Sequence, residues 1–104
     1  MNDLRHLGTN YATTTAQNVT ISDISKYKTL MFTGFEGSGT NHLDSIFIPT
    51  LTFKEGVAVT INAYALQNYR ATVTIKYISN TSVQLYAREL LGWNQVGIRV
   101  YGLI

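Results

Sequence analysis

Apolar and polar residues alternate one by one along the second half of this chain, as expected of β-strands that bury one face. The longest such stretch is RATVTIKYISNTSVQLYARE, residues 70–89. It divides into two alternating halves around the polar link SNTS at residues 79–82. Two strands joined by so short a link are predicted to form a β-hairpin. The apolar positions predicted to face inward are Val73, Ile75, Tyr77, Val83, Leu85 and Ala87.

Two further segments alternate in the same way, VAVTINAYAL at residues 57–66 and VGIRVYGLI at residues 96–104. Chain ends usually fray unless they are tied down, so an apolar terminal segment is expected to pair inside a sheet. The inward positions predicted in the two segments are Val57, Val59, Ile61, Ala63, Val96, Ile98 and Val100.

Pro49 interrupts the apolar segment SIFIPTLTF, residues 45–53. Proline has no N–H to donate to a sheet, so it predicts an edge strand or a bulge. Further upstream, the capping residues of Ser22–Ser25 predict a short helical turn or a bend, followed by a strand in TLMFTGF, residues 29–35. No stretch of ten residues shows a helical period. The recurring strands therefore predict an all-β fold, an antiparallel β-sandwich.

The first 18 residues differ from the rest of the chain. They are polar, include the tract ATTTA at residues 12–16, and show no sustained period. We expect residues 1–18 to be an N-terminal arm or connector that becomes ordered against a partner. A length of 104 residues is the size of one domain, so residues 19–104 are predicted to form a single β-sandwich domain.

Charged residues make up 13% of the chain, against roughly 25% in an average soluble protein. Thr, Ser and Asn replace them, which suits a surface that packs against copies of itself or binds neutral ligands such as sugars. The net charge of +2 comes from scattered basic residues, which disfavours nucleic-acid binding. The chain has no cysteine and therefore no disulfide and no thiolate metal site.

No apolar run approaches the roughly 20 residues needed to span a bilayer, so no membrane insertion is expected. The N-terminus also lacks the apolar stretch of a signal peptide. We therefore expect that the N-terminus does not direct export of the chain.

The segments ISKYKTLMF, SIFIP, VTIKYISNTSVQLYA and IRVYGLI follow one another within residues 19–104, with a Gly-rich loop between the first two. In this order they resemble the C-terminal β-sandwich domains of bacteriophage tail fibres and related virion appendages. Many of those domains end in an Ile-Tyr-Gly-Ile-like strand, matched here by Val100–Ile104. The resemblance implies a jelly-roll-like sandwich, homotrimeric assembly and a surface that contacts the host cell. It supplies no catalytic residues, and this chain lacks the long repetitive shaft of a full fibre.

The loop GFEGSGTNHLD, residues 34–44, lacks the glycine spacing, the following helix and the lysine of a phosphate-binding loop. Loops at the end of a sandwich commonly carry binding residues. Trp93 offers a flat ring for stacking on a sugar. The alternative is that Trp93 plugs the end of the core, which the preceding Leu90 and Leu91 favour. The candidate ligand-binding residues are Asn41, His42, Trp93, Asn94 and Gln95.

Catalytic and metal-binding chemistry finds little support in the residue types. Glu36, His42 and Asp44 share one loop, but a metal site needs three or four ligands at defined spacing, and such a trio is more often solvated. The six acidic residues form no pair within a polar cleft, and nothing resembles a nucleophile elbow. We therefore expect no enzyme activity, no metal and no cofactor.

Several outward-facing residues are of the types enriched at protein interfaces. If their strands are neighbours, these residues form one patch that a trimer would bury. The alternative is that the tyrosines only shield the sheet backbone. The candidate subunit-interface residues are Tyr64, Tyr86, Arg88, Arg99 and Tyr101.

Three functional hypotheses follow. The first is a non-catalytic, homotrimeric virion appendage domain that binds a host-surface receptor, with a glycan as the expected receptor. The second is a structural virion protein, a capsid decoration or tail connector, that binds other virion proteins. The third is a carbohydrate-binding module. The first two place the protein in the virion after its synthesis in the cytoplasm of the bacterial host.

Overall fold

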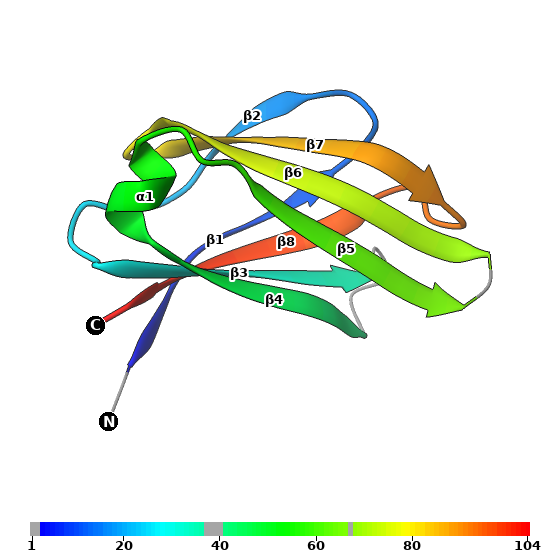
Figure 1. Ribbon diagram of the computed structural model, residues 1–104, viewed down its shortest axis with the longest axis horizontal. Helices are drawn as coiled ribbons and strands as arrows, with labels where there is room; N and C mark the ends of the chain where they lie inside the picture. Colours follow the sequence, from blue (N-terminus) through cyan, green and yellow to red (C-terminus); the bar gives the residue numbers. More distant parts are fainter. Residues whose placement is uncertain (1–2, 37–40, 67) are drawn as a thin grey trace.

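The computed structural model describes residues 3–36, 41–66 and 68–104, which form two four-stranded antiparallel sheets packed face to face (Figure 1). This arrangement confirms the predicted antiparallel β-sandwich. One sheet has the strand order β1–β8–β3–β4 and the other β2–β7–β6–β5. The elements are β1 (Leu4–Ala12), β2 (Gln17–Thr20), β3 (Thr29–Glu36), β4 (His42–Pro49), α1 (Thr50–Lys54), β5 (Val59–Leu66), β6 (Tyr69–Ser79), β7 (Ser82–Leu91) and β8 (Val96–Leu103).

The first two strands of the chain pair with the last two. β1 pairs with β8 in one sheet, and β2 pairs with β7 in the other, so the first two strands lie beside the last two. The first and last strands of the chain are thus neighbours in both sheets. The strands between them pair with their sequence neighbours: β3 with β4, β5 with β6, and β6 with β7.

The core between the sheets is built from the inward side chains of the alternating strands. Phe32 and Ile98 of one sheet belong to the same cluster as Ile61, Ile75 and Leu85 of the other, and all five are at most 1% exposed. Full burial of such a side chain contributes roughly 1.5–3 kcal/mol. The alternation over residues 70–89 therefore predicted the inward face correctly.

Strand β8 lies between β1 and β3 and is paired along both of its edges. Val96, Ile98 and Val100 point into the core and are at most 2% exposed. The prediction that the apolar terminal segment pairs inside a sheet is thus confirmed.

Strands β1 and β2 occupy most of residues 1–18, where the polarity of the sequence predicts an arm. For these strands that prediction is wrong. A register shift between His6 and Gly8 breaks the alternation and turns Leu7 into the core. Gly8 carries no apolar signal, yet a Cβ atom there would lie 2.9 Å from Cγ2 of Ile21. The glycine therefore allows Ile21 to pack against the strand.

Residues 50–54 form the helix α1, although the sequence pattern places residues 50–53 in an extended apolar segment. Pro49 ends β4 at the edge of its sheet, as predicted, and lies directly before the helix. Phe53 is fully buried, with its ring centroid 5.1 Å from that of Phe32 and 5.9 Å from that of Tyr77. Periodicity does not distinguish a strand from a helix over so short a run. Within the part of the chain that the structure describes, no helix has the length and apolar character to cross a membrane.

The segment before β3 forms a turn, in agreement with the predicted bend. The Ser25 N–H donates to Oδ1 of Asp23 over 2.8 Å, and the Tyr27 N–H donates to the carbonyl of Ile24 over 3.2 Å. Ile24 is fully buried and anchors the turn to the core.

Val57 precedes β5 and is 51% exposed, so its predicted inward position is wrong.

Candidate functional site

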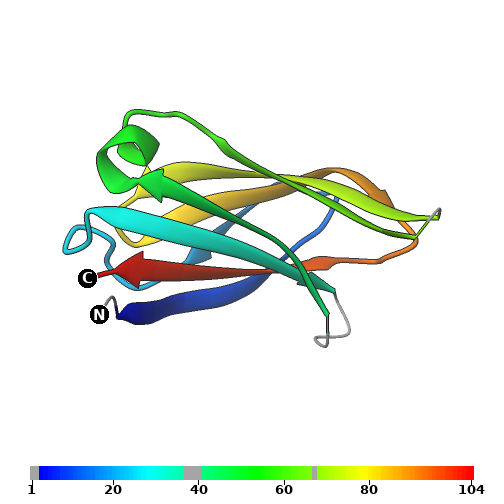
Figure 2. The same cartoon turned by 60° about the horizontal axis from the view of Figure 1, so that its bottom comes forward.

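Strands β1, β3, β5 and β7 end, and β2, β4, β6 and β8 begin, at the same end of the sandwich, opposite α1 (Figures 1 and 2). Val96, the first residue of β8, is opposite both Ala12, the last residue of β1, and Glu36, the last residue of β3. In the other sheet, Arg70 near the start of β6 is opposite Leu91 at the end of β7. We call this end, with the β1–β2, β3–β4, β5–β6 and β7–β8 loops, the loop end.

The β3–β4 loop is closed at its base by two hydrogen bonds. The Asn41 side-chain amide donates to Oε1 of Glu36 over 2.8 Å, and the Glu36 N–H donates to the Asn41 carbonyl over 2.9 Å. His42 begins β4, pairs with Phe35 and places Nε2 3.3 Å from Oγ of Ser45. Asn41 and His42 are both exposed. Residues 37–40, the rest of the predicted recognition loop, lie outside the described residues.

Trp93 packs partly against the core and partly faces solvent. Its ring lies 5.5 Å from the ring of Tyr69 at an interplanar angle of 55°. Gly92 has a φ of +85°, a conformation that side chains rarely adopt, and a Cβ atom there would overlap Asn68 and Tyr69. The β7–β8 loop is therefore held against the start of β6. Trp93 therefore partly plugs the edge of the core, and part of its ring remains exposed.

The structure brings the five candidate ligand-binding residues to the loop end, in two loops whose flanking strands, β3 and β8, are neighbours. Asn94 is exposed and Gln95 is partly buried. Tyr69, which is 38% exposed and whose ring is tilted against that of Trp93, was missed by sequence reasoning. The sequence offered one signal for it: Tyr69 directly precedes the alternating segment of residues 70–79, so it was expected at the end of a strand.

The five candidate interface residues do not form one patch. Tyr64 lies on β5 and Tyr86 and Arg88 lie on β7, all on the outer face of the β2–β7–β6–β5 sheet. Arg99 and Tyr101 lie on β8, on the outer face of the opposite sheet. The condition for a single patch, that these strands are neighbours, is not met, because β5 and β7 belong to one sheet and β8 to the other.

The outer face of the β1–β8–β3–β4 sheet carries many apolar and aromatic side chains. Paired residues of neighbouring strands put His6, Tyr101, Met31 and Phe47 in one row across the sheet, and Phe47 is 59% exposed. We call this surface the aromatic face. Its apolar, aromatic and basic members are Leu4, His6, Tyr11, Arg99, Tyr101, Leu103, Met31, Phe35 and Phe47, and the hydroxyl side chains of Thr9, Thr29, Thr33 and Ser45 lie on the same face.

The outer face of the other sheet is chemically different. Its rows consist mainly of hydroxyl, amide and charged side chains, with an ion pair of 3.3 Å between Arg70 and Glu89. Tyr64 and Tyr86 are its aromatic members, 69% and 37% exposed. We call this surface the polar face. The two sides of the sandwich therefore suit different neighbours.

The titratable groups of the β3–β4 region have separate partners. Oε1 of Glu36 accepts from Asn41, Nε2 of His42 lies near Ser45, and Oδ1 of Asp44 accepts from the backbone N–H of Ser45. Over residues 3–36, 41–66 and 68–104, no group of three or more His, Cys, Asp or Glu side chains is placed to hold a metal ion.

Comparison with protein-family models, curated proteins and solved structures finds no match to this chain.

Proposed function

We propose that this chain is a non-catalytic binding domain of the virion-appendage kind, similar to a tail-fibre tip, that binds a host-surface glycan at its loop end. The observation that carries this proposal is that Asn41, His42 and the segment Trp93–Gln95 adjoin the ends of β3 and β8, where Glu36 is paired with Val96. Binding residues are commonly presented by loops on a rigid scaffold.

The chemistry of the loop end suits a sugar. The Trp93–Tyr69 pair offers aromatic surface for the apolar face of a sugar ring, and the exposed amides of Asn41 and Asn94 offer both donors and acceptors to its hydroxyl groups. Recognition is non-covalent. Individual sites of this kind are weak, and repetition of the site in an oligomer raises the overall affinity without new contacts.

The aromatic face supplies the contact between copies of this chain in a homotrimer. Four strands about 4.8 Å apart, each about eight residues long at 3.3 Å per residue, cover about 500 Å². In a homotrimer three such surfaces bury about 1,500 Å² in total, or about 500 Å² at each of the three contacts, so each contact needs further area from outside this face to reach the roughly 1,000 Å² of a specific interface. Arg99 and Tyr101 of the candidate interface set belong to this face, whereas Tyr64, Tyr86 and Arg88 remain on the polar face.

A second function, a structural virion protein that binds other virion proteins, is favoured by the same aromatic face if its neighbour is a different chain. A carbohydrate-binding module is the third function, and the polar face with Tyr64 and Tyr86 favours it. The mass in solution separates them. The first function predicts about three times the 11.6 kDa of one chain, and a carbohydrate-binding module predicts a monomer.

The test of glycan recognition is binding of the labelled protein to a glycan array and to a panel of bacterial cells. Trp93→Ala is expected to weaken binding at least about tenfold, since a central aromatic anchor carries much of a site's binding energy. The control is Tyr86→Ala, which removes an aromatic ring from the polar face and leaves the loop end intact. Binding that is unchanged in Trp93→Ala, or absent from the parent protein, would contradict this function.

A further inference from the structure

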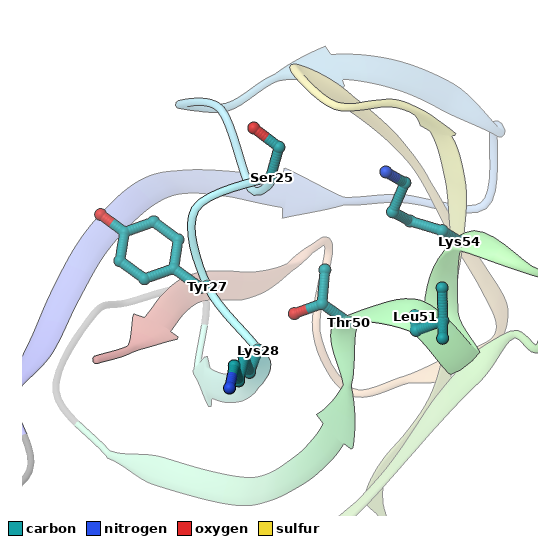
Figure 3. Close-up of a pocket in the computed structure, with 6 residues that line it drawn as sticks. All are labelled: Ser25, Tyr27, Lys28, Thr50, Leu51 and Lys54. Carbon is teal, nitrogen blue, oxygen red and sulfur yellow. The ribbon is translucent and has the colours of Figure 1, made fainter.

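A cavity of about 300 Å³ lies beside α1, at the opposite end of the sandwich from the loop end (Figure 3). One wall comes from the turn between β2 and β3, and the other from α1. The lining residues are Ser25, Tyr27, Lys28, Thr50, Leu51 and Lys54. This volume is at the lower end of the range of small-molecule sites, roughly 300–1,000 Å³, so a ligand about the size of one sugar ring fits.

The walls of the cavity are held in place by contacts outside it. The Thr50 N–H donates to the Lys28 carbonyl over 2.8 Å, which joins the start of α1 to the start of β3. The turn is anchored by Ile24, which is fully buried, and the Tyr27 ring lies against Gly102 of β8. The cavity is therefore formed in advance of binding.

The charges at the cavity are positive. Lys28 and Lys54 line it, and no acidic side chain belongs to the lining. Asp23 is in the same turn; its carboxylate accepts the Ser25 N–H and interacts with Lys54, so it offsets part of this positive charge. Ammonium groups on flexible stems bind carboxylates and phosphates as point charges. The lining thus selects an anion.

Thr50 provides an independent indication of a ligand. The residue is 5% exposed, and its buried Oγ1 has no hydrogen-bond partner among the described residues. Figure 3 shows this oxygen directed from the start of α1 toward the segment of Tyr27 and Lys28. Leaving a buried hydroxyl unpaired costs stability. Threonine in a helix adopts two χ1 rotamers, so rotation about χ1 can redirect this hydroxyl.

We propose that this cavity binds an anionic ligand the size of a monosaccharide. Lys28 and Lys54 hold its carboxylate or phosphoryl group. The Thr50 hydroxyl pairs with a hydroxyl group of the ligand, because it can both donate and accept. This site does not depend on glycan binding at the loop end, which lies at the other end of the molecule.

The test is titration of the full chain with glucuronate, glucose 6-phosphate and glucose, followed by calorimetry and by amide NMR shifts. The first two ligands carry the two sources of negative charge, and glucose is the neutral control. Binding of either anionic sugar, with shifts at the amides of Ser25, Lys28 and Leu51, supports the site. Equal affinity for glucose, or no binding of either anionic sugar, overturns it.

Charge-removing variants locate the site. Lys28→Gln and Lys54→Gln are each expected to weaken binding about two- to fivefold, the range for an exposed ion pair. Lys76→Gln is the matched control, because it removes the same charge from an exposed position on the polar face. Trp93→Ala is also expected to leave this affinity unchanged, which separates this site from the one at the loop end. An equal loss in Lys76→Gln overturns the site, since it indicates binding by net charge alone.

Thr50→Val replaces the unpaired hydroxyl with a methyl group of similar size. If the hydroxyl serves a ligand, the melting temperature of the unliganded protein stays the same or rises while the affinity for the anionic sugar falls. If the melting temperature falls and the affinity is unchanged, the Thr50 hydroxyl contributes to stability only, and its proposed contact with the ligand is wrong.

Discussion

The ring of Phe35 on β3 lies against Gly97, its paired residue on the neighbouring strand β8, so closely that a Cβ atom at Gly97 would overlap the ring. The guanidinium carbon of Arg99 lies 3.9 Å from the centroid of the same ring, and the ring of Tyr11 lies 5.7 Å away, near edge-on. Phe35 is only 3% exposed although it points away from the core between the sheets. The glycine is what allows this aromatic cluster to lie flat on the sheet.

Gly97→Ala is therefore expected to lower the free energy of unfolding by roughly 1–3 kcal/mol, the usual cost of overpacking. Urea unfolding followed by circular dichroism measures the change. Gly34→Ala is the control, because the nearest atom, Cγ2 of Ile61, would be 3.3 Å from its new Cβ, so its effect should be smaller. A Gly97→Ala protein as stable as the parent would contradict the close packing of Phe35.

Removing an exposed ring from the aromatic face should disrupt assembly without unfolding the domain. Phe47→Ser on the edge strand β4 is expected to shift the mass in light scattering from about three chains toward one, because it removes apolar area from the proposed interface. Tyr64→Ser is the matched control, since Tyr64 is also highly exposed but lies on the polar face. If Tyr64→Ser dissociates the protein and Phe47→Ser does not, the interface lies on the polar face and the proposed interface is contradicted.

Shortening a core side chain of β8 should be costly. Ile98→Ala is expected to lower the free energy of unfolding by about 2–5 kcal/mol, because Ile98 is 1% exposed and its removal leaves a cavity between the sheets. Ile104→Ala, at a position 63% exposed, is the control and should change the stability by less than about 0.5 kcal/mol. Similar effects of the two substitutions in a chemical unfolding experiment would argue against a central position for β8.

Asp23 should titrate below the ordinary aspartate value of 3.8, because the backbone N–H and the hydroxyl of Ser25 hydrogen bond to its carboxylate and thereby lower its pKa. Nearby Lys26 and Lys54 act in the same direction. The folded-state pKa is lower than the unfolded one, so the contribution to stability is present above the unfolded pKa and is lost as the pH falls through the folded pKa. Carbon-13 NMR titration of the side-chain carboxyl checks this, and a midpoint at or above 3.8 would contradict the turn geometry.

The fold was predictable from sequence wherever a strand buries one face and exposes the other. The hairpin of β6 and β7 and the terminal strand β8 show this pattern, and Val73, Leu85 and Ile98 were placed correctly. β1 was not predictable in this way, because its register shift and Gly8 conceal the inward positions. α1 was missed because five residues are too few to show a helical period.

The sites were less predictable than the fold, because they depend on how strands are distributed between the two sheets. Alternation shows that Tyr86 and Tyr101 point outward, but it contains no information about which layer each belongs to. The aromatic face had one signal in the sequence: β3 has apolar residues at consecutive positions, such as Met31 and Phe32, and therefore on both of its faces. The cavity beside α1 had none, since α1 itself was not expected.

The position of β8 between β1 and β3 has a consequence for the growing chain. Leu4 is paired with Leu103, so β1 has no partner in its sheet until the ribosome has made almost the whole of this sequence. Until then the edges of β1 and β3 that will flank β8 stay open, and such edges invite pairing with other chains. Closure across so long a loop is also slow compared with pairing of adjacent strands. The step at which β8 pairs with β1 and β3 therefore comes late in the synthesis of this domain, and until then the risk of aggregation through these open edges persists.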